Sequence, residues 1–303
     1  MDFPLISCFI GPKEVKKKFK ALSGLNIKAA YPFTKDSLLS LKISRKTGQD
    51  LTDYFSEECR VVCRFLDYPT PYEVYTKNID FYSKLAEKSE TTYEIFREKI
   101  YDDTKNFCSN FPLEVALALY RYFKPDKILD FSSGWGDRLI AAIAYGNCQE
   151  YQGVDPSVCM AEKYKKIVDF FGKKRENFRV SKAPFEKFDV KSNHYNLVFT
   201  SPPFFNLEIY ENTGDQSVNI YKDLESWKKG FLFPSVQKSY RALVDGGYLA
   251  LYVVDSGKNK YVEDLKLFIL KKIQGFVYKG TIDWINISGR RKIRKIYVWK
   301  KED

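Results

Sequence analysis

The alternation of apolar strands with helical segments after residue 126 constrains the fold of this 303-residue chain more than any other feature. Strands joined by helical crossovers pair in parallel, and the helices cover the faces of the sheet. Two late runs, 276–286 and 292–301, flank a Ser-Gly-Arg turn and predict an antiparallel hairpin at one edge. We therefore expect an α/β fold with a mostly parallel seven-stranded sheet, whose other strands are 127–131, 151–155, 178–183, 195–200 and 245–255.

The first 110 residues lack this rhythm. Segments such as 12–24 and 91–107 have helical patterns, and no comparable succession of strand, turn and helix occurs there. The helical segment 111–123 leads directly into the first strand of the sheet. We therefore predict a mainly helical domain over 1–110, with nucleic-acid recognition as a candidate role, and an α/β domain over 111–303.

Charge and cysteine content indicate the setting of the protein. A net charge of +11 favours a polyanionic partner such as nucleic acid. No apolar run approaches the ~20 residues that cross a bilayer, and the N-terminus does not resemble a signal peptide, so we expect a cytoplasmic protein without membrane contact. Free thiols in a reducing compartment suit the six scattered cysteines, and their spacing does not indicate a metal site: Cys8, Cys59, Cys63, Cys108, Cys148 and Cys159.

A glycine turn follows the first strand of the α/β domain. The sequence ILDFSSGWGDRL ends that strand in Asp130 and then turns through Gly134 and Gly136 into a helix. Glycines allow a sharp turn and let a ligand approach the backbone closely. Asp155 stands 19 residues after Gly136, at the tip of the next strand, where an acid can accept hydrogen bonds from both ribose hydroxyls of an adenosine. This spacing predicts a nucleoside cofactor.

The identity of the cofactor follows from charge. The third glycine of a dinucleotide fingerprint would fall at Leu139, so the cradle for a pyrophosphate is incomplete. Asp130 would repel a phosphate but suits an ammonium group. S-adenosylmethionine (SAM) carries an ammonium group and no phosphate, so the sequence predicts SAM. An NAD-linked oxidoreductase is also disfavoured because the single histidine, His194, leaves no evident proton donor.

A Ser-Pro-Pro-Phe run, Ser201 to Phe204, follows the fourth strand. Proline cannot donate to a sheet ladder, so Pro202 and Pro203 end the strand and fix the backbone. The Ser201 hydroxyl and the Pro202 carbonyl are two acceptors that suit the two hydrogens of an exocyclic amino group, and Phe204 offers a face for stacking a base. The run therefore predicts a device that positions an amine against a methyl donor. Carbon methylation of cytosine is disfavoured, because no cysteine nucleophile follows this strand.

Together the two motifs resemble those of the SAM-dependent amino-methyltransferases, and SPPF is most similar to the motif of the cytosine N4-specific DNA methyltransferases. The resemblance covers about 111–303 and implies a Rossmann-like class I methyltransferase fold that methylates the exocyclic amine of a nucleobase, cytosine N4 in DNA first. The order of the motifs departs from many SPP-type enzymes, in which it is permuted. Adenine N6 in DNA, a base amine in RNA, and a degenerate fold that binds nucleic acid without turnover stay open. DNA is the favoured partner, and the resemblance also raises a restriction endonuclease as a partner.

The site residues can be grouped by expected role. Those expected at the cofactor are Asp130, Ser132, Gly134, Trp135, Gly136, Asp155, Pro156 and Glu186. The resemblance implies that the target amine is held by the SPPF run, Ser201, Pro202, Pro203 and Phe204. Further substrate contacts are expected from the loop after this run and from the basic run at 289–295, namely Phe205, Asn206, Glu208, Arg290, Arg291 and Arg294.

Overall fold

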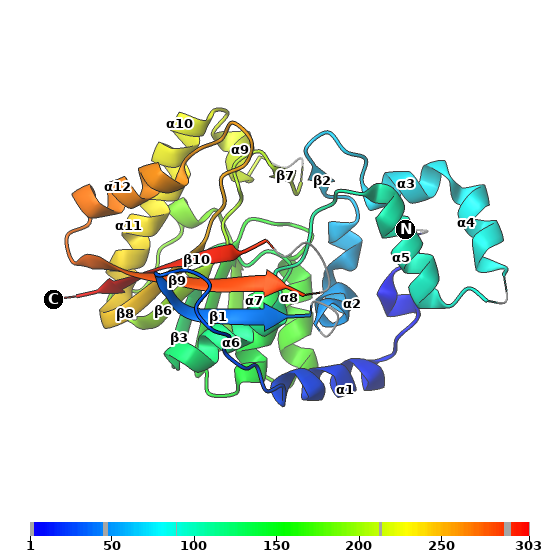
Figure 1. Cartoon of the computed structure of the whole chain (residues 1–303), viewed down its shortest axis with the longest axis horizontal. Coiled ribbons are helices and arrows are strands. Elements are labelled where there is room, and N and C mark those ends of the chain that lie inside the picture. The colour runs from blue at the N-terminus through cyan, green and yellow to red at the C-terminus, as the bar shows by residue number, and fades with distance from the viewer. Residues whose placement is uncertain (1–2, 45–47, 89, 212–213, 288–291, 303) are drawn as a thin grey trace.

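The computed structural model describes residues 3–44, 48–88, 90–211, 214–287 and 292–302. Within these residues the central sheet has eight strands in the order β1-β9-β10-β8-β6-β3-β4-β5 (Figure 1). β10 is antiparallel to both of its neighbours, and the other pairs are parallel. The predicted α/β fold with an antiparallel C-terminal hairpin is therefore confirmed. Its strands are β1 (Ser37–Ile43), β3 (Lys127–Asp130), β4 (Glu150–Asp155), β5 (Phe178–Lys182), β6 (Tyr195–Thr200), β8 (Leu243–Tyr252), β9 (Phe276–Asn286) and β10 (Arg294–Lys301).

Helices cover both faces of this sheet. Side chains alternate between the faces along a strand. Ile128 therefore joins the hydrophobic cluster of one face, while Leu129 joins the cluster of the other. The first face carries α1 (Pro12–Ser23), α2 (Gln49–Arg60), α6 (Leu113–Phe123), α7 (Asp137–Tyr145) and α8 (Ala161–Phe170). The second carries η2 (Phe185–Lys187), α10 (Leu224–Trp227), the π-helical turn η3 (Lys228–Leu232), α11 (Phe233–Ala242) and α12 (Val262–Lys272).

The eighth strand comes from the N-terminal part of the chain and corrects the prediction of seven. β1 pairs in parallel with β9, more than 230 positions later in the sequence. A seven-residue segment without a flanking strand–helix rhythm gave no sign of this distant pairing. Val15 and Leu51 also lie in the same hydrophobic cluster as Ile128. The boundary near residue 110 stays a prediction, but residues on its two sides share one core.

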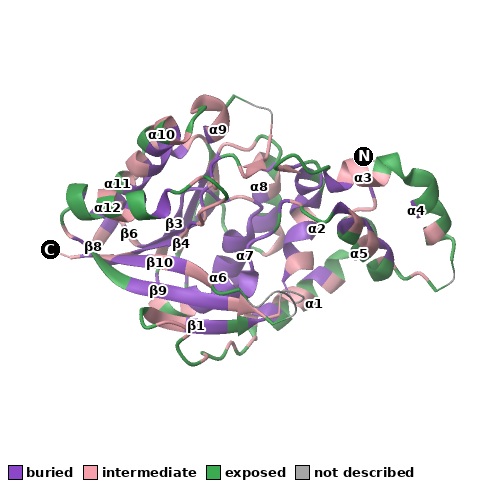
Figure 2. Ribbon diagram, turned by 45° about the horizontal axis from the view of Figure 1, so that its top comes forward, coloured by how far each residue is buried: buried purple, intermediate pink, exposed green. Residues whose placement is uncertain are grey.

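Three helices form a smaller lobe beside the sheet. They are α3 (Pro71–Lys77), α4 (Ile79–Ala86) and α5 (Tyr93–Thr104), and they project to one side in Figure 1. Tyr82, Phe96 and Ile100 form a separate hydrophobic cluster there. Figure 2 shows that α4 is largely exposed, whereas the central strands and α7 are mostly buried.

Two disulfide bonds overturn the prediction that these thiols are free. Cys59 pairs with Cys159, and Cys63 pairs with Cys108, while Cys8 and Cys148 are free. The partners are 100 and 45 residues apart in the sequence. The first bond joins α2 to the turn before α8, and the second joins the residues just after α2 to the segment before α6. Among the described residues, no helix is both long and apolar enough to cross a membrane.

The order of the strands fixes where a ligand can bind. The chain proceeds from β3 to β4 and β5 on one side and then returns to place β6 on the other side of β3. Ligands of open α/β sheets bind at such a reversal, outside the carboxyl ends of the strands. The glycine turn after β3 and the SPPF run after β6 therefore meet at one edge.

Candidate active site

A pocket lies at this edge of the sheet and gathers most of the predicted site residues. The predicted residues that line it are Ser132, Gly134, Trp135, Asp155, Pro156, Glu186, Ser201, Pro203, Phe204, Glu208 and Arg294. Those that do not line it are Asp130, Gly136, Pro202, Phe205 and Asn206. Arg290 and Arg291 lie outside the described residues.

The glycine turn adopts the backbone that the sequence predicted. Gly134 and Gly136 have φ angles of +56° and +89°, in the left-handed region that disfavours other residues. A Cβ added to Gly136 would lie 2.9 Å from the Ile167 side chain, so Gly136 also permits close packing of α7 against α8. Gly136 thus shapes the turn from behind, while Gly134 faces the pocket.

Asp155 lies opposite this turn, at the end of β4. Its carboxylate accepts hydrogen bonds from the backbone N–H of Gly134 at 2.8 Å and of Ser157 at 2.9 Å. Burial raises the pKa of Asp155 to about 6, against the opposing effect of these two donors. The carboxylate is therefore held rigidly in the pocket wall, where the hydroxyls of a ribose would meet it.

Asp130 ends β3, as predicted, but it does not line the pocket. It is fully buried behind the pocket wall, where it accepts hydrogen bonds from Arg138 Nε at 2.8 Å and from the Tyr151 hydroxyl at 2.6 Å. The expected contact with a ligand ammonium is thus replaced by an internal ion pair. Arg138 itself lines the pocket, and sequence reasoning missed it. Its position as the second residue of α7, eight residues after Asp130, was the available signal.

Glu186 lies on η2, after β5, and lines the pocket. Its Oε1 accepts a hydrogen bond from the Tyr221 hydroxyl at 3.3 Å. Its Oε2 is buried and has no hydrogen-bond partner among the described residues. Burial raises the pKa of this carboxyl group. A buried acceptor without a partner, at the wall of a pocket, fits a ligand that brings an amino group.

The half of the pocket around the SPPF run, which we call the acceptor half, is aromatic. Phe204 meets Tyr252 edge to face with ring centroids 5.6 Å apart, and Phe111 meets Tyr252 at the same separation. Trp284 also lines the pocket, and its ring centroid lies 6.3 Å from that of Tyr252. Ser201 is the polar residue at the end of β6 in this half. A flat ring of nucleobase size suits these walls.

The loop after the SPPF run divides between the pocket and the protein interior. Phe205 is buried against Trp227, and exposed Asn206 accepts a hydrogen bond from Asn259, so neither lines the pocket. Glu208 does line it, and its carboxylate accepts a hydrogen bond from the Tyr210 hydroxyl. Burial raises the pKa of Glu208 to about 7.

The same loop is anchored at two further points. β7 (Glu208–Ile209) pairs with β2 (Arg64–Phe65) of the N-terminal part. The Glu211 carboxylate accepts hydrogen bonds from the backbone N–H groups of Val158 at 3.1 Å and Cys159 at 3.0 Å. These contacts hold the loop as a fixed wall of the pocket.

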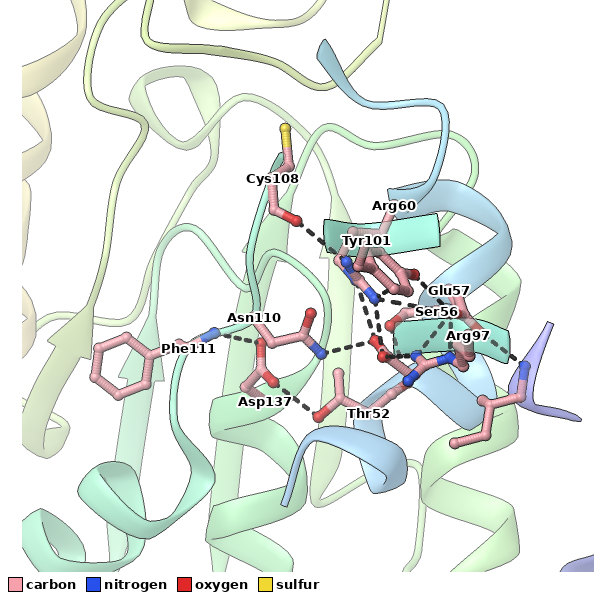
Figure 3. A network of polar contacts seen from close by, with 12 residues as sticks. Thr52, Ser56, Glu57, Arg60, Arg97, Tyr101, Cys108, Asn110, Phe111 and Asp137 are labelled. Carbon is pink, nitrogen blue, oxygen red and sulfur yellow. Dashed lines mark hydrogen bonds and ion pairs between the residues drawn. The ribbon is translucent and has the colours of Figure 1, made fainter. Parts of the chain in front are cut away.

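The segment 109–112, just before α6, was not predicted to belong to the site, but it lines the pocket. A buried polar network from α2 supports it (Figure 3). Asn110 Nδ2 donates to Asp53 at 3.0 Å, and Arg60 donates to the carbonyl of Cys108 at 3.2 Å. Asp137, the first residue of α7, accepts hydrogen bonds from Thr52 at 2.7 Å and from the backbone N–H of Phe111 at 3.2 Å. The Ser-Asn pair before the proline of this segment was the sequence signal.

Comparisons with known proteins give similar folds at low scores. No protein-family model and no curated protein sequence matches the chain. TrmN from Thermus thermophilus is 16% identical with a TM-score of 0.45, covering 63% of this chain and 49% of that one. An rRNA methylase from Streptococcus thermophilus is 12% identical with a TM-score of 0.42, covering 65% and 99%. A tRNA (m1A58) methyltransferase, TrmI from Aquifex aeolicus, is 10% identical with a TM-score of 0.40, covering 64% and 70%. The matched part thus spans about half the length of TrmN, and function is inferred below from the residues of this chain.

Proposed function

We propose that this chain is a SAM-dependent methyltransferase that transfers a methyl group to the exocyclic amine of a nucleobase, with cytosine N4 in DNA as the first candidate. One observation supports this most. A single pocket at the reversal of strand order gathers the turn at Gly134, the carboxylate of Asp155 and the SPPF run. A nucleoside cofactor and a planar amine substrate thereby share one cavity.

SAM fits the other half of the pocket, the cofactor half around Gly134, Asp155 and Glu186. Asp155 accepts from the ribose, the backbone at Gly134 allows close approach, and the free Oε2 of Glu186 accepts from the adenine amine. When bound, SAM supplies a methyl group on a sulfonium sulfur. Since Asp130 is paired with Arg138, the preference for SAM over NAD depends on Leu139 and on the SPPF run rather than on the charge of Asp130.

The acceptor half positions the substrate. The Ser201 hydroxyl lines the pocket and accepts an amine hydrogen, which directs the nitrogen lone pair toward the cofactor half. The Pro202 carbonyl, predicted as the second acceptor, belongs to a residue that does not line the pocket. Phe204 and Tyr252 meet edge to face and form two adjoining aromatic walls against which the base packs. No covalent enzyme intermediate is needed, because the amine nitrogen is itself the nucleophile. In duplex DNA the base must first leave the helical stack.

DNA is placed before RNA because of the similarity of SPPF to the cytosine N4 motif, and the net charge of +11 suits either polymer. Adenine N6 and a base amine of RNA are the alternatives within the same chemistry. A binding module without turnover is disfavoured because the pocket retains Ser201, Asp155 and Gly134 together.

Nucleoside mass spectrometry tests the proposal. DNA and RNA from cells that express the chain are digested beside a Ser201→Ala control, and SAM affinity is measured by calorimetry on both purified proteins. We expect N4-methylcytosine in DNA with the wild-type chain alone, and equal SAM affinity for the two proteins. N6-methyladenine or a methylated RNA base would keep the proposed chemistry but assign another substrate. SAM binding without any methylated nucleoside would contradict the proposal.

A further inference from the structure

Arg294 lies at the same edge of the sheet as the SPPF run, although it comes 90 positions after Phe204 in the sequence. Thr200, at the end of β6, is paired with Leu251 in β8, and Tyr252 is paired with Ile296 in β10. Because β10 is antiparallel to β8, its first residue, Arg294, lies just beyond the carboxyl end of β8. The topology therefore brings this guanidinium to the acceptor half of the pocket, which it lines.

The surroundings of Arg294 orient it and leave donor capacity unused. Arg294 faces Trp284 across the β9–β10 pair, and its guanidinium carbon lies 4.7 Å from the centroid of the indole ring. Such a stack holds the guanidinium plane in a defined direction. Its Nη1 is buried and has no hydrogen-bond partner among the described residues. A buried donor without an acceptor is costly, so a ligand that supplies an acceptor is favoured here.

We propose that Arg294 recognises the unprotonated ring nitrogen beside the target amine and thereby restricts the substrate to cytosine or adenine. This inference rests on the proposed function. Cytosine N3 and adenine N1 are acceptors adjacent to the exocyclic amine, and a guanidinium offers donors alone. With an amine hydrogen donated to the Ser201 hydroxyl, the free Nη1 completes recognition of the edge that base pairing normally covers.

The same geometry disfavours guanine when its base-pairing edge faces Arg294. The guanine amine is flanked by N1, which carries a hydrogen on that edge, and by N3, an acceptor that lies on the other side next to the glycosidic bond. With the base-pairing edge toward Arg294, the N1–H group and the guanidinium are two donors that face each other. Rejection then arises from an unpaired buried donor on each side, which discriminates more strongly than a missing favourable contact. A contact with the phosphate backbone, the alternative role for a cation of the basic run at 289–295, would give no such discrimination.

Arg294→Met tests the inference, with Arg294→Lys as a conservative variant and Lys292→Met as a matched change of an exposed cation two residues away. The readouts are methylation of random-sequence single-stranded DNA, SAM affinity, and the salt dependence of affinity for that DNA. We expect Arg294→Met to lower turnover about 10- to 100-fold, the scale of one hydrogen bond to a charged group. SAM affinity and the salt slope should not change, Arg294→Lys should restore part of the turnover, and Lys292→Met should keep it.

Three outcomes would overturn the inference while the proposed function survives. The first is a salt slope that falls by about one unit in Arg294→Met, which identifies a phosphate contact. The second is N2-methylguanine among the products of the wild-type chain, and the third is unchanged turnover in Arg294→Met. A wild-type chain that binds SAM but methylates no base contradicts the proposed function and the inference together. Replacing cytosine by 3-deazacytosine should lower wild-type turnover and leave the residual turnover of Arg294→Met unaffected.

Discussion

Reduction of the two disulfide bonds is expected to cost this protein a large part of its stability. Cys59 and Cys159 are 100 residues apart, and the chain-entropy model gives about 4.7 kcal/mol for a loop of that length. Cys63 and Cys108 are 45 residues apart, for which the same relation gives about 4 kcal/mol. The smaller loop lies inside the larger one, so the contributions are less than additive. We expect reduction to lower the free energy of unfolding by between about 5 and 8 kcal/mol.

Reduction should also loosen the walls of the pocket, because one cysteine of each disulfide lies beside a segment that lines the pocket. Cys159 follows Asp155 by four residues and donates its backbone N–H to Glu211 at 3.0 Å. Cys108 directly precedes Ser109, which lines the pocket. Both bonds start from or just after α2 and hold two walls of the pocket in place. SAM affinity is therefore expected to fall on reduction even where the chain stays folded.

Urea unfolding with and without dithiothreitol measures the first effect, and calorimetry with SAM measures the second. Cys148→Ser, at a free cysteine, is the matched control for Cys59→Ser and Cys63→Ser. Alkylation of the unfolded, unreduced chain should label two of the six cysteines, and all six after reduction. Labelling of all six cysteines before reduction, or the same urea midpoint with and without dithiothreitol, would refute this reasoning.

Three further predictions concern buried charges. Asp155→Ala should weaken SAM binding by about 1–3 kcal/mol in calorimetry, and unaltered affinity would place the ribose elsewhere. Arg138→Met leaves Asp130 buried without its cation and should lower the free energy of unfolding by about 3–5 kcal/mol, whereas equal urea midpoints would deny the ion pair that role. Burial raises the pKa of Glu208 to about 7 and that of Asp155 to about 6, so between about pH 4.5 and 7 the folded state holds more protons than the unfolded state. Stability from these groups should therefore fall as pH rises through that window, and Glu208→Gln should flatten the slope of the urea midpoint against pH near 7.

The sequence predicted those parts of the site that depend on one strand and the turn after it. Gly134 and Ser201 each follow a buried strand, and parallel pairing alone brings the ends of β3 and β6 to one edge. The signal was local in each case, and the global rule that joins the two motifs is strict for parallel sheets.

The features that escaped prediction all depend on contacts between distant segments. β1 reaches β9 only in the folded chain, and the partners of Cys59 and Cys63 are set by the packing of α2. Asp130 shows the same limit for a single side chain. Its place at a strand end was right, but the prediction did not account for Arg138, whose guanidinium turns inward and pairs with it.

The N-terminal residues have a structural role at the pocket, independent of any role in nucleic-acid recognition. Asp53 holds Asn110, the Cys63–Cys108 bond fixes the chain just before Ser109, and β2 pairs with β7 beside Glu208. Three independent contacts from one stretch of the N-terminal part thus converge on the acceptor side of one cavity. A separate recognition domain would join the α/β part through few contacts and leave its pocket complete. Residues 49–65 instead support the pocket wall at 109–112 and at Glu208, so substitutions in this stretch are expected to alter the pocket itself.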